Sequence, residues 1–378
     1  MINEKRLLDT FCEYVQIDSE TKNEKAMGEK LVADLKAMGF EVKTDNAGAA
    51  FGSNGFNVCG FKAGTIEGPG MVQCAHMDTV KPGNGIKPII TDGLIHTDGS
   101  TILAGDDKSG IAAIMEAART IADKNLPHRD IEVLFTIGEE GGLNGAKNLD
   151  YDMVKGKNAF VYDAGGEVGS VMTCGPGQIQ VDAVIKGRTA HAGIAPETGI
   201  SAIQVAAKAI AKMNLLRIDE ETTCNIGTIK AEFATNIVPD KCEIHAEVRS
   251  RNLDKLNAQA AHIKECLEST CAEMGAEIDV ALTTNYVSFA VAEDDELVKM
   301  VENACGDLGL NFSTVKGGGG SDANVMAFHG FKSVVLGTGM TKVHTTDECL
   351  KVEDLNKTSE LVLYLLPHYD RIDGCPAT

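Results

Sequence analysis

Hydrophobic and polar positions follow two different periods along this chain. Apolar residues recur at helical spacing from Leu7 to Val15 and again from about Glu24 to Met38, where Gly39 ends the pattern. A further helix is predicted at 111–121, and short apolar runs typical of buried strands lie at 57–61, 71–75, 131–137 and 159–162. Helices that alternate with buried strands predict an α/β layer around a mainly parallel, mixed sheet.

The pattern changes near Gly175. Polar and apolar residues alternate from 178 to 186, as in a half-exposed strand. The following segments predict a helix at 199–213, strands at 222–229 and 241–250, a helix at 253–274 and a strand at 276–282. This β-α-β-β-α-β order is the ferredoxin-like pattern, an antiparallel sheet with two helices on one face. We therefore expect an α/β domain, 1–175 and 286–378, interrupted by an α+β domain at 176–285.

Amino-acid composition limits the kinds of binding partner and the cellular compartment that we expect. The 378 residues predict two or three cores, and 55 acidic against 35 basic residues give a net charge of −20. Nucleic acids and anionic membranes repel such a surface, so neither is expected as a partner. Eleven scattered cysteines without a CxxC pair predict free thiols in a reducing cytoplasm. The charged N-terminal segment predicts no signal peptide, and no apolar stretch predicts a transmembrane helix.

Histidine and acidic side chains follow several predicted strands or precede a predicted helix. The candidate set is His76, Asp78, Asp106, Asp107, Glu139, Glu140, Asp163 and His344. Taken singly, His76 would be a strand-end histidine hydrogen-bonded to Asp78, and the two adjacent aspartates could equally cap a helix or bridge two cations. As a set, nitrogen and carboxylate ligands without cysteine favour zinc, with manganese or cobalt as substitutes. The i, i+2 spacing leads us to expect that Asp78 accepts a hydrogen bond from the spare ring nitrogen of His76.

These motifs together resemble those of the dinuclear zinc exopeptidases, a family that includes peptidase T, glutamate carboxypeptidase and aminoacylase. The matching runs are HMDTV at 76–80, GDDKSG at 105–110, GEEGG at 138–142 and HTTDE at 344–348. The runs ETT at 221–223, TNIVPD at 235–240 and GGGSDAN at 318–324 are similar to the peptidase T-like branch. The resemblance covers nearly the whole chain. It implies a zinc-exopeptidase catalytic domain with an inserted ferredoxin-like dimerisation or lid domain.

The resemblance also implies a ligand set for two zinc ions per subunit. His76 and Asp163 would bind one ion, and Glu140 and His344 would bind the other. Asp106 would bridge the two ions, because the bridging aspartate of this family lies two residues before the lysine. In this family the peptide bond that follows the bridging aspartate is typically cis.

Roles outside the ligand set follow from the same resemblance. Glu139 would be the general base on the bridging water, and His191 would donate to the developing oxyanion in the active site of a partner subunit. Asn236 and Arg249 would hold the substrate, since arginine grips a carboxylate with two hydrogen bonds. Exposed backbone N–H groups would meet the substrate in the loop formed by Gly318, Gly319, Gly320 and Ser321.

The sequence therefore predicts a cytoplasmic, homodimeric metallopeptidase that hydrolyses short peptides as a tripeptide aminopeptidase does, by attack of zinc-activated water. Two alternatives use the same metal site, an N-acyl amino acid amidohydrolase and a carboxypeptidase. A third alternative is a catalytically inactive, dimeric peptide-binding protein.

Overall fold

The structure is a computed structural model that describes residues 1–67 and 70–368. It divides into two compact units. The first comprises Met1–Cys174, Ala290–Gly317 and the chain from Ser321 onward, and the second comprises Gly175–Phe289 and Gly318–Gly320. The predicted insertion, 176–285, lies within the second unit. The end of the predicted outer domain, 369–378, lies outside the described residues.

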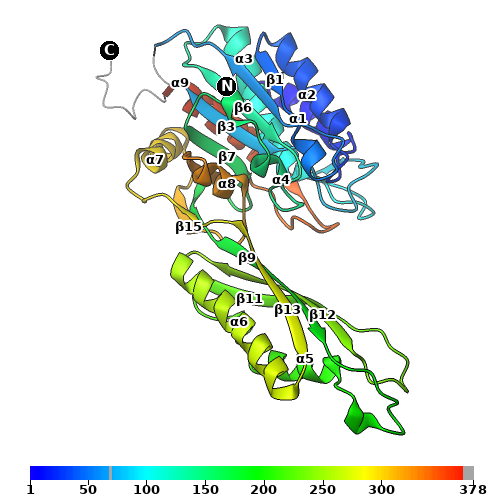
Figure 1. Cartoon of the computed structure of the whole chain (residues 1–378). Coiled ribbons are helices and arrows are strands. Elements are labelled where there is room, and N and C mark those ends of the chain that lie inside the picture. Colours follow the sequence, from blue (N-terminus) through cyan, green and yellow to red (C-terminus); the bar gives the residue numbers. More distant parts are fainter. Residues whose placement is uncertain (68–69, 369–378) are drawn as a thin grey trace. The chain divides into compact units, whose positions relative to one another are not determined.

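A nine-stranded mixed sheet forms the centre of the first unit (Figure 1). Its strands are β1 Glu41–Thr44, β2 Val58–Lys62, β3 Met71–His76, β6 Ile131–Thr136, β7 Asn158–Ala164, β8 Ser170–Gly175, β14 Phe289–Ala290, β15 Ser313–Lys316 and β16 Lys332–Gly337. The order is β1-β2-β6-β3-β7-β16-β8-β14, with β15 paired to β8. The central strands β6, β3, β7 and β16 run parallel. All residues of β3 and β6 are buried, as expected for strands covered on both faces.

Helices pack on this sheet and on one another. They are α1 Glu4–Val15, α2 Lys25–Ala37, α3 Gly105–Lys124, α4 Asn144–Lys147, α7 Glu296–Leu308, α8 Asp322–Phe328 and α9 Val352–His368, with the 3₁₀ turns η1 Ala47–Ala50 and η2 Tyr151–Met153. The predicted helix at 111–121 is the centre of α3, which contacts β3, β7, α1 and α9. A small sheet that the sequence did not predict has the order β17-β5-β4, formed by β4 Ile89–Thr91, β5 Leu94–His96 and β17 Leu350–Lys351.

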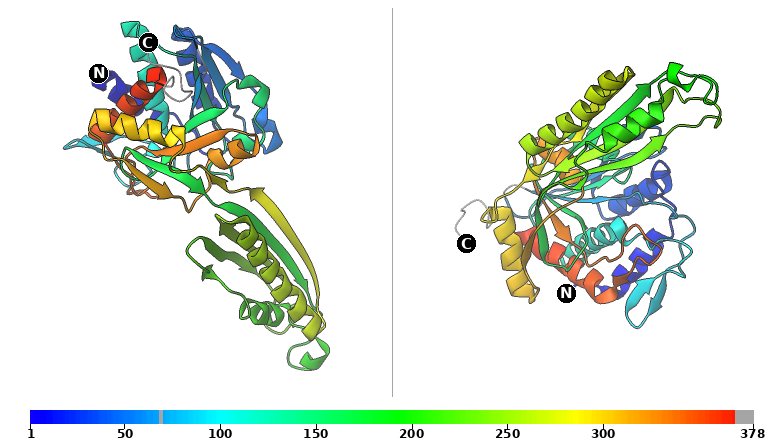
Figure 2. Two further views of the ribbon diagram at one scale, coloured as in Figure 1. Left: turned by 90° about the vertical axis from the view of Figure 1, so that its left-hand side faces the viewer. Right: turned by 90° about the horizontal axis from the view of Figure 1, so that it is seen from below.

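The second unit confirms the predicted α+β insertion. Its elements are β9 Gly177–Lys186, η3 Pro196–Thr198, α5 Ala202–Ile210, β10 Leu216–Arg217, β11 Thr222–Lys230, β12 Lys241–Ser250, α6 Leu253–Met274 and β13 Glu277–Tyr286. The sheet is antiparallel, with the order β10-β11-β12-β9-β13. Helices α5 and α6 cover one face of it (Figures 1 and 2). Burial alternates along β9, so the other face carries polar side chains.

The segment Gly318–Gly320 is grouped with the second unit rather than with the first. A Cβ atom on Gly320 would lie 2.5 Å from ring atoms of Tyr286, so only glycine allows this close approach. No helix in the described part of the chain combines the length and the apolarity that a membrane span requires.

Candidate metal centre and substrate-binding residues

The parallel strands bring the predicted metal ligands to one edge of the sheet. His76 ends β3, Asp163 lies near the end of β7, and Glu139 and Glu140 follow β6. His76 is directly opposite Thr136, the last residue of β6. Because the carboxyl ends of parallel strands share an edge, side chains that are far apart in the sequence converge there.

Five side chains form a continuous line of contacts at this edge. His76 Nε2 lies 3.5 Å from Asp163 Oδ1 and 3.0 Å from Asp106 Oδ1. The other carboxylate oxygen of Asp106, Oδ2, lies 3.2 Å from His344 Nε2, which in turn lies 2.8 Å from Glu140 Oε1. Asp106 therefore turns one oxygen toward each histidine, as a carboxylate shared by two cations would. The structure brings together all five residues of the predicted ligand set.

The neighbouring aspartate has a different environment. The Asp106–Asp107 peptide bond is cis, as the resemblance implied. Asp107 is fully buried, and its carboxylate accepts backbone hydrogen bonds from His76 N at 3.2 Å and Gly110 N at 3.3 Å. Its oxygens also lie near His76 and Asp163. Only Asp106 contacts both histidines among the described residues, which favours it over Asp107 as the bridging group.

The ring of His76 is held in the tautomer that a cation needs. Its Nδ1 lies 2.9 Å from the backbone oxygen of Asp78, which can only accept a hydrogen bond. Nδ1 therefore donates to that oxygen, which leaves Nε2, on the side of Asp106 and Asp163, as the nitrogen that could bind a cation. Burial lowers the pKa of His76, but the hydrogen bonds to Asp106, Asp163 and Asp78 raise it well above its ordinary value, so these carboxylates favour a positive charge at this position.

The electrostatics of the cluster also fit bound cations. Burial, reinforced by the charge of Asp106, raises the pKa of Asp163 to about 7. The neighbouring carboxylates of Asp106 and Glu140 raise the pKa of His344 to about 10. Within the described part of the chain, the buried Oε1 of Glu140 has no partner in hydrogen-bond geometry, although His344 is near. Buried carboxylates are costly without compensation, and divalent ions on this donor set would supply it.

The Asp78 carboxylate has a different main contact from the one expected. Its Oδ1 lies 3.5 Å from His76 Nδ1, while the backbone oxygen makes the shorter contact. The carboxylate instead accepts hydrogen bonds from the backbone N–H groups of Glu139 at 2.9 Å and Glu140 at 3.3 Å, and from the Thr21 hydroxyl at 2.8 Å. The turn after β6 offers several donors to one buried anion, so the carboxylate is drawn toward that turn.

Glu139 lies in this turn with a buried carboxylate. Burial and the charge of Asp163 raise its pKa well above the ordinary value. A carboxylate that favours its protonated form, close to the metal ligands, is suited to accept and return a proton.

Comparison with known proteins decides the family. Residues 74–368 match the model of peptidase family M20/M25/M40. The chain belongs to this peptidase family. Within it, the uncharacterized protein YqjE of Bacillus subtilis (strain 168) is 43% identical over 97% of this chain and 99% of that protein.

Two solved structures are similar over almost the whole M20 peptidase. A tripeptidase from Staphylococcus aureus subsp. aureus Mu50 superimposes with a TM-score of 0.95 and 40% identity, covering 98% of this chain and 100% of the other. The aminopeptidase PepT from Bacillus cereus ATCC 10987 gives a TM-score of 0.90 and 46% identity, covering 97% and 98%. These findings confirm the predicted family, the fold class and the assignment as a metal-dependent exopeptidase.

In this M20 peptidase, the predicted oxyanion donor and one of the predicted substrate-binding residues lie together in the second unit. His191 and Asn236 are exposed and belong to adjoining loops, joined by a bridge between His191 and Ile237 and by the Ala192 N–H donating to Asn236 O at 2.9 Å. The His191 ring is oriented by its own loop, since its Nδ1 accepts from Gly193 N at 3.2 Å. The sequence placed both residues in the insertion but gave no sign that they are neighbours.

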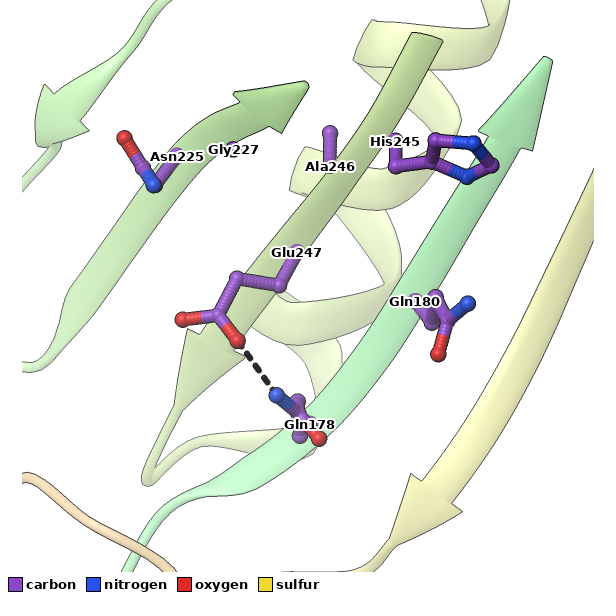
Figure 3. A pocket seen from close by; sticks show the side chains of 7 residues that line it. All are labelled: Gln178, Gln180, Asn225, Gly227, His245, Ala246 and Glu247. Carbon is purple, nitrogen blue, oxygen red and sulfur yellow. Dashed lines mark hydrogen bonds between the residues drawn. The ribbon is translucent and has the colours of Figure 1, made fainter. Parts of the chain in front are cut away.

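Arg249 lies on the polar face of the second-unit sheet and is already paired. Its Nε lies 2.9 Å from Glu247 Oε1, and its NH2 lies 3.0 Å from Glu247 Oε2. Glu247 also accepts from Gln178, as Figure 3 shows. Glu247 and Gln178, but not Arg249, belong to the lining of a pocket of about 370 Å³, which is formed by Gln178, Gln180, Asn225, Gly227, His245, Ala246 and Glu247. A substrate carboxylate at Arg249 would have to share the guanidinium with Glu247.

The residues of the glycine loop differ in their surroundings. Gly318 and Gly319 are exposed, and an added Cβ atom on either would have no neighbour within 4 Å. Ser321 differs, because its N–H donates to Asn324 Oδ1 at 3.0 Å at the start of α8. The prediction of a free backbone donor at Ser321 is therefore wrong. Helix capping uses that group.

Two buried carboxylates near the ligands were not recognised from the sequence. Asp322 is 2% exposed and contacts the Thr136 hydroxyl through Oδ2, and burial raises its pKa to about 6. Glu348 is 1% exposed and accepts three backbone hydrogen bonds from residues 103–106. Asp322 lies in the GGGSDAN run and Glu348 in the HTTDE run, two of the motifs that resemble the known family. Membership in these motifs was the feature of the sequence that could have pointed to them.

Proposed function

We propose that this protein is a dinuclear aminopeptidase that releases the N-terminal residue of short peptides, tripeptides in particular. The observation that supports this most strongly is the orientation of Asp106, whose two carboxylate oxygens face His76 and His344 separately. The Staphylococcus aureus tripeptidase and the Bacillus cereus aminopeptidase PepT support the choice of substrate.

In this proposal His76 and Asp163 hold one divalent ion, Glu140 and His344 hold the other, and Asp106 holds both. Zinc suits the donor set, and cobalt or manganese would substitute. Once bound, such ions polarise a carbonyl oxygen and lower the pKa of a water molecule.

Glu139 supplies the proton transfers. Its carboxylate removes a proton from the attacking water and then gives that proton to the leaving amine, so one group serves in both halves of the reaction. The Asp78 carboxylate contributes by fixing the backbone of the turn that carries Glu139.

Substrate contacts are proposed for the second unit. Asn236 and Arg249 would bind the peptide, together with backbone N–H groups of Gly318, Gly319 and Gly320. His191 would donate a hydrogen bond to the oxyanion in the active site of a second copy, in a homodimer. Exposed apolar side chains on the loops around His191 support an interface there: Ile194, Phe233 and Ile237.

A cytoplasmic location is part of the proposal. Ten cysteines in the described part of the chain are free thiols, and several are buried. Reduced thiols in this number fit a reducing compartment.

A panel of matched peptides tests the proposed activity. Purified protein with added zinc or cobalt is given a free tripeptide, its N-acetyl form, its C-terminal amide and an N-acetyl amino acid, and the products are identified by mass spectrometry. We expect release of the N-terminal residue from the free tripeptide and little turnover of the N-acetyl forms. The Glu139→Gln protein serves as a control for contaminating peptidases.

Each alternative predicts a different product. Release of the C-terminal residue would indicate a carboxypeptidase, and deacylation of the N-acetyl amino acid would indicate an amidohydrolase. Peptide binding without turnover by the metal-loaded protein would indicate a binding protein.

A further inference from the structure

His344 stands apart from the other proposed ligands because burial does not hold it in place. Its side chain is 52% exposed, whereas those of His76, Asp106 and Glu140 are between 2% and 10% exposed. Its backbone is in the left-handed region, with φ of 63°. An exposed ligand on such a loop keeps a fixed position only if the loop itself is anchored.

The loop that carries His344 is closed at its base. Thr341 and Cys349 exchange two backbone hydrogen bonds, of 3.0 and 3.1 Å. Inside the loop, the Glu348 N–H donates to Thr345 O at 3.1 Å. Glu348 is therefore fixed to the same short segment as His344.

The Glu348 side chain reaches a distant part of the chain. Its Oε2 accepts the N–H groups of Leu103 and Ala104, both at 2.9 Å, and its Oε1 accepts the N–H of Asp106 at 3.0 Å. The contact with Asp106 spans 242 residues of sequence. A Cβ atom on Gly105 would lie 3.1 Å from Oε1, so glycine at that position leaves room for the carboxylate.

Three backbone donors on one buried anion make a strong local restraint. Hydrogen bonds to a carboxylate are shorter and stronger than those between neutral groups. Both oxygens of Glu348 accept N–H groups, so the carboxylate holds the backbone of residues 103–106. Glu348 therefore connects two segments: its backbone belongs to the loop of His344, and its side chain binds the backbone of Asp106.

We propose that Glu348 is a positioning residue for the second metal position, the one formed by Glu140, His344 and Asp106. By tying two loops together, its carboxylate sets the 3.2 Å separation between Asp106 Oδ2 and His344 Nε2. The inference rests on the proposed dinuclear centre. It predicts a larger effect on the ion held by His344, because Glu348 is tied to the segments of both His344 and Asp106. At the other position it holds only the segment of the shared Asp106, and His76 and Asp163 make no hydrogen bond or ion pair with Glu348 among the described residues.

Cobalt titration of the chelator-treated, full-length protein tests this. The visible spectrum of Co²⁺ follows the filling of each position. The Glu348→Gln variant keeps the side-chain volume and one acceptor oxygen but turns an NH₂ group toward a backbone donor. The matched control is Asp347→Asn, which makes the same charge change on an exposed neighbour in the same loop.

Wild-type protein and Asp347→Asn should bind two ions. In Glu348→Gln the first ion should bind as in wild type and the second about 10- to 100-fold more weakly, as is typical when a group that orients a metal ligand is lost. Raising the metal concentration should restore activity to Glu348→Gln but not to His344→Ala, which lacks the ligand itself. The unfolding temperature of the metal-free protein reports any general loss of stability.

Two results would overturn the proposal for Glu348. One is wild-type affinity for both ions in Glu348→Gln, and the other is equal weakening of both, which would mean that Glu348 supports the fold in general. If wild-type protein binds only one ion, the proposed dinuclear centre is itself wrong, and the role proposed for Glu348 is then wrong as well.

Discussion

The contact between Asp78 and the turn after β6 leads to a specific prediction. The buried Asp78 carboxylate holds the N–H groups of Glu139 and Glu140, at 2.9 and 3.3 Å. In Asp78→Asn the remaining oxygen can accept only one of these, and the NH₂ group faces the other donor. We therefore expect displacement of the turn, and with it of the general base, while His76 keeps its hydrogen bond to the backbone oxygen.

The size of the effect follows from the number of donors left without an acceptor. One buried N–H without a partner costs about 1–3 kcal/mol. If the transition state bears that full cost, kcat falls about 5- to 150-fold, since each 1.4 kcal/mol is tenfold in rate. Asp78→Ala leaves both N–H groups without this acceptor and should cost more. It should still cost less than Glu139→Gln, which removes the base.

Steady-state kinetics on a tripeptide at saturating metal measures this, with KM separated from kcat. Thr21→Val is the matched control, because it removes only the hydroxyl that donates to the same carboxylate and leaves both backbone contacts. Its loss in kcat should be smaller than that of Asp78→Asn. A kcat for Asp78→Asn within about twofold of wild type would refute the argument that this carboxylate positions the base.

Three further predictions concern other residues. Glu139→Gln should keep its metal content and unfolding temperature but lose about 10²- to 10⁴-fold in kcat, and near-normal turnover would place the base elsewhere. Arg249→Ala should lower kcat/KM for a free-acid tripeptide by roughly 10- to 150-fold and discriminate less against the C-terminal amide, with unchanged metal content; equal cleavage of both by wild type would exclude carboxylate recognition. Co-expressed Glu139→Gln and His191→Ala chains should regain activity as mixed dimers, and an active monomer in sedimentation would contradict action across subunits.

Where local sequence predicted a helix or a strand, most of the bounds agree with the structure to within a few residues, but it predicted no element for β8, β16, α7 or α9. The predicted helix 253–274 coincides with α6, and the predicted strand 131–137 differs from β6 by its last residue. Hydrophobic periodicity depends on nearest neighbours along the chain, so it can be read without the fold. Short strands without a clear pattern were missed, among them β4, β5 and β17. Each is two or three residues long.

The residues of the proposed ligand set could also be predicted from the sequence. His76, Glu140 and Asp163 lie at or just after the ends of buried strands, where α/β sheets place their ligands. The resemblance to a known family added His344 and the choice of Asp106, which residue spacing alone left open.

Tertiary structure alone decided which atoms meet. The Asp78 carboxylate was expected to accept a hydrogen bond from His76. It lies 3.5 Å from that ring, but its backbone hydrogen bonds come from Glu139 and Glu140, because that turn offers two backbone donors. Glu348 reads as an ordinary acidic residue until the fold brings it to Asp106, across 242 residues. Such contacts depend on how distant segments pack and on which buried polar groups need partners. The sequence pattern determined what each segment becomes, and packing determined which buried charge satisfies which donor.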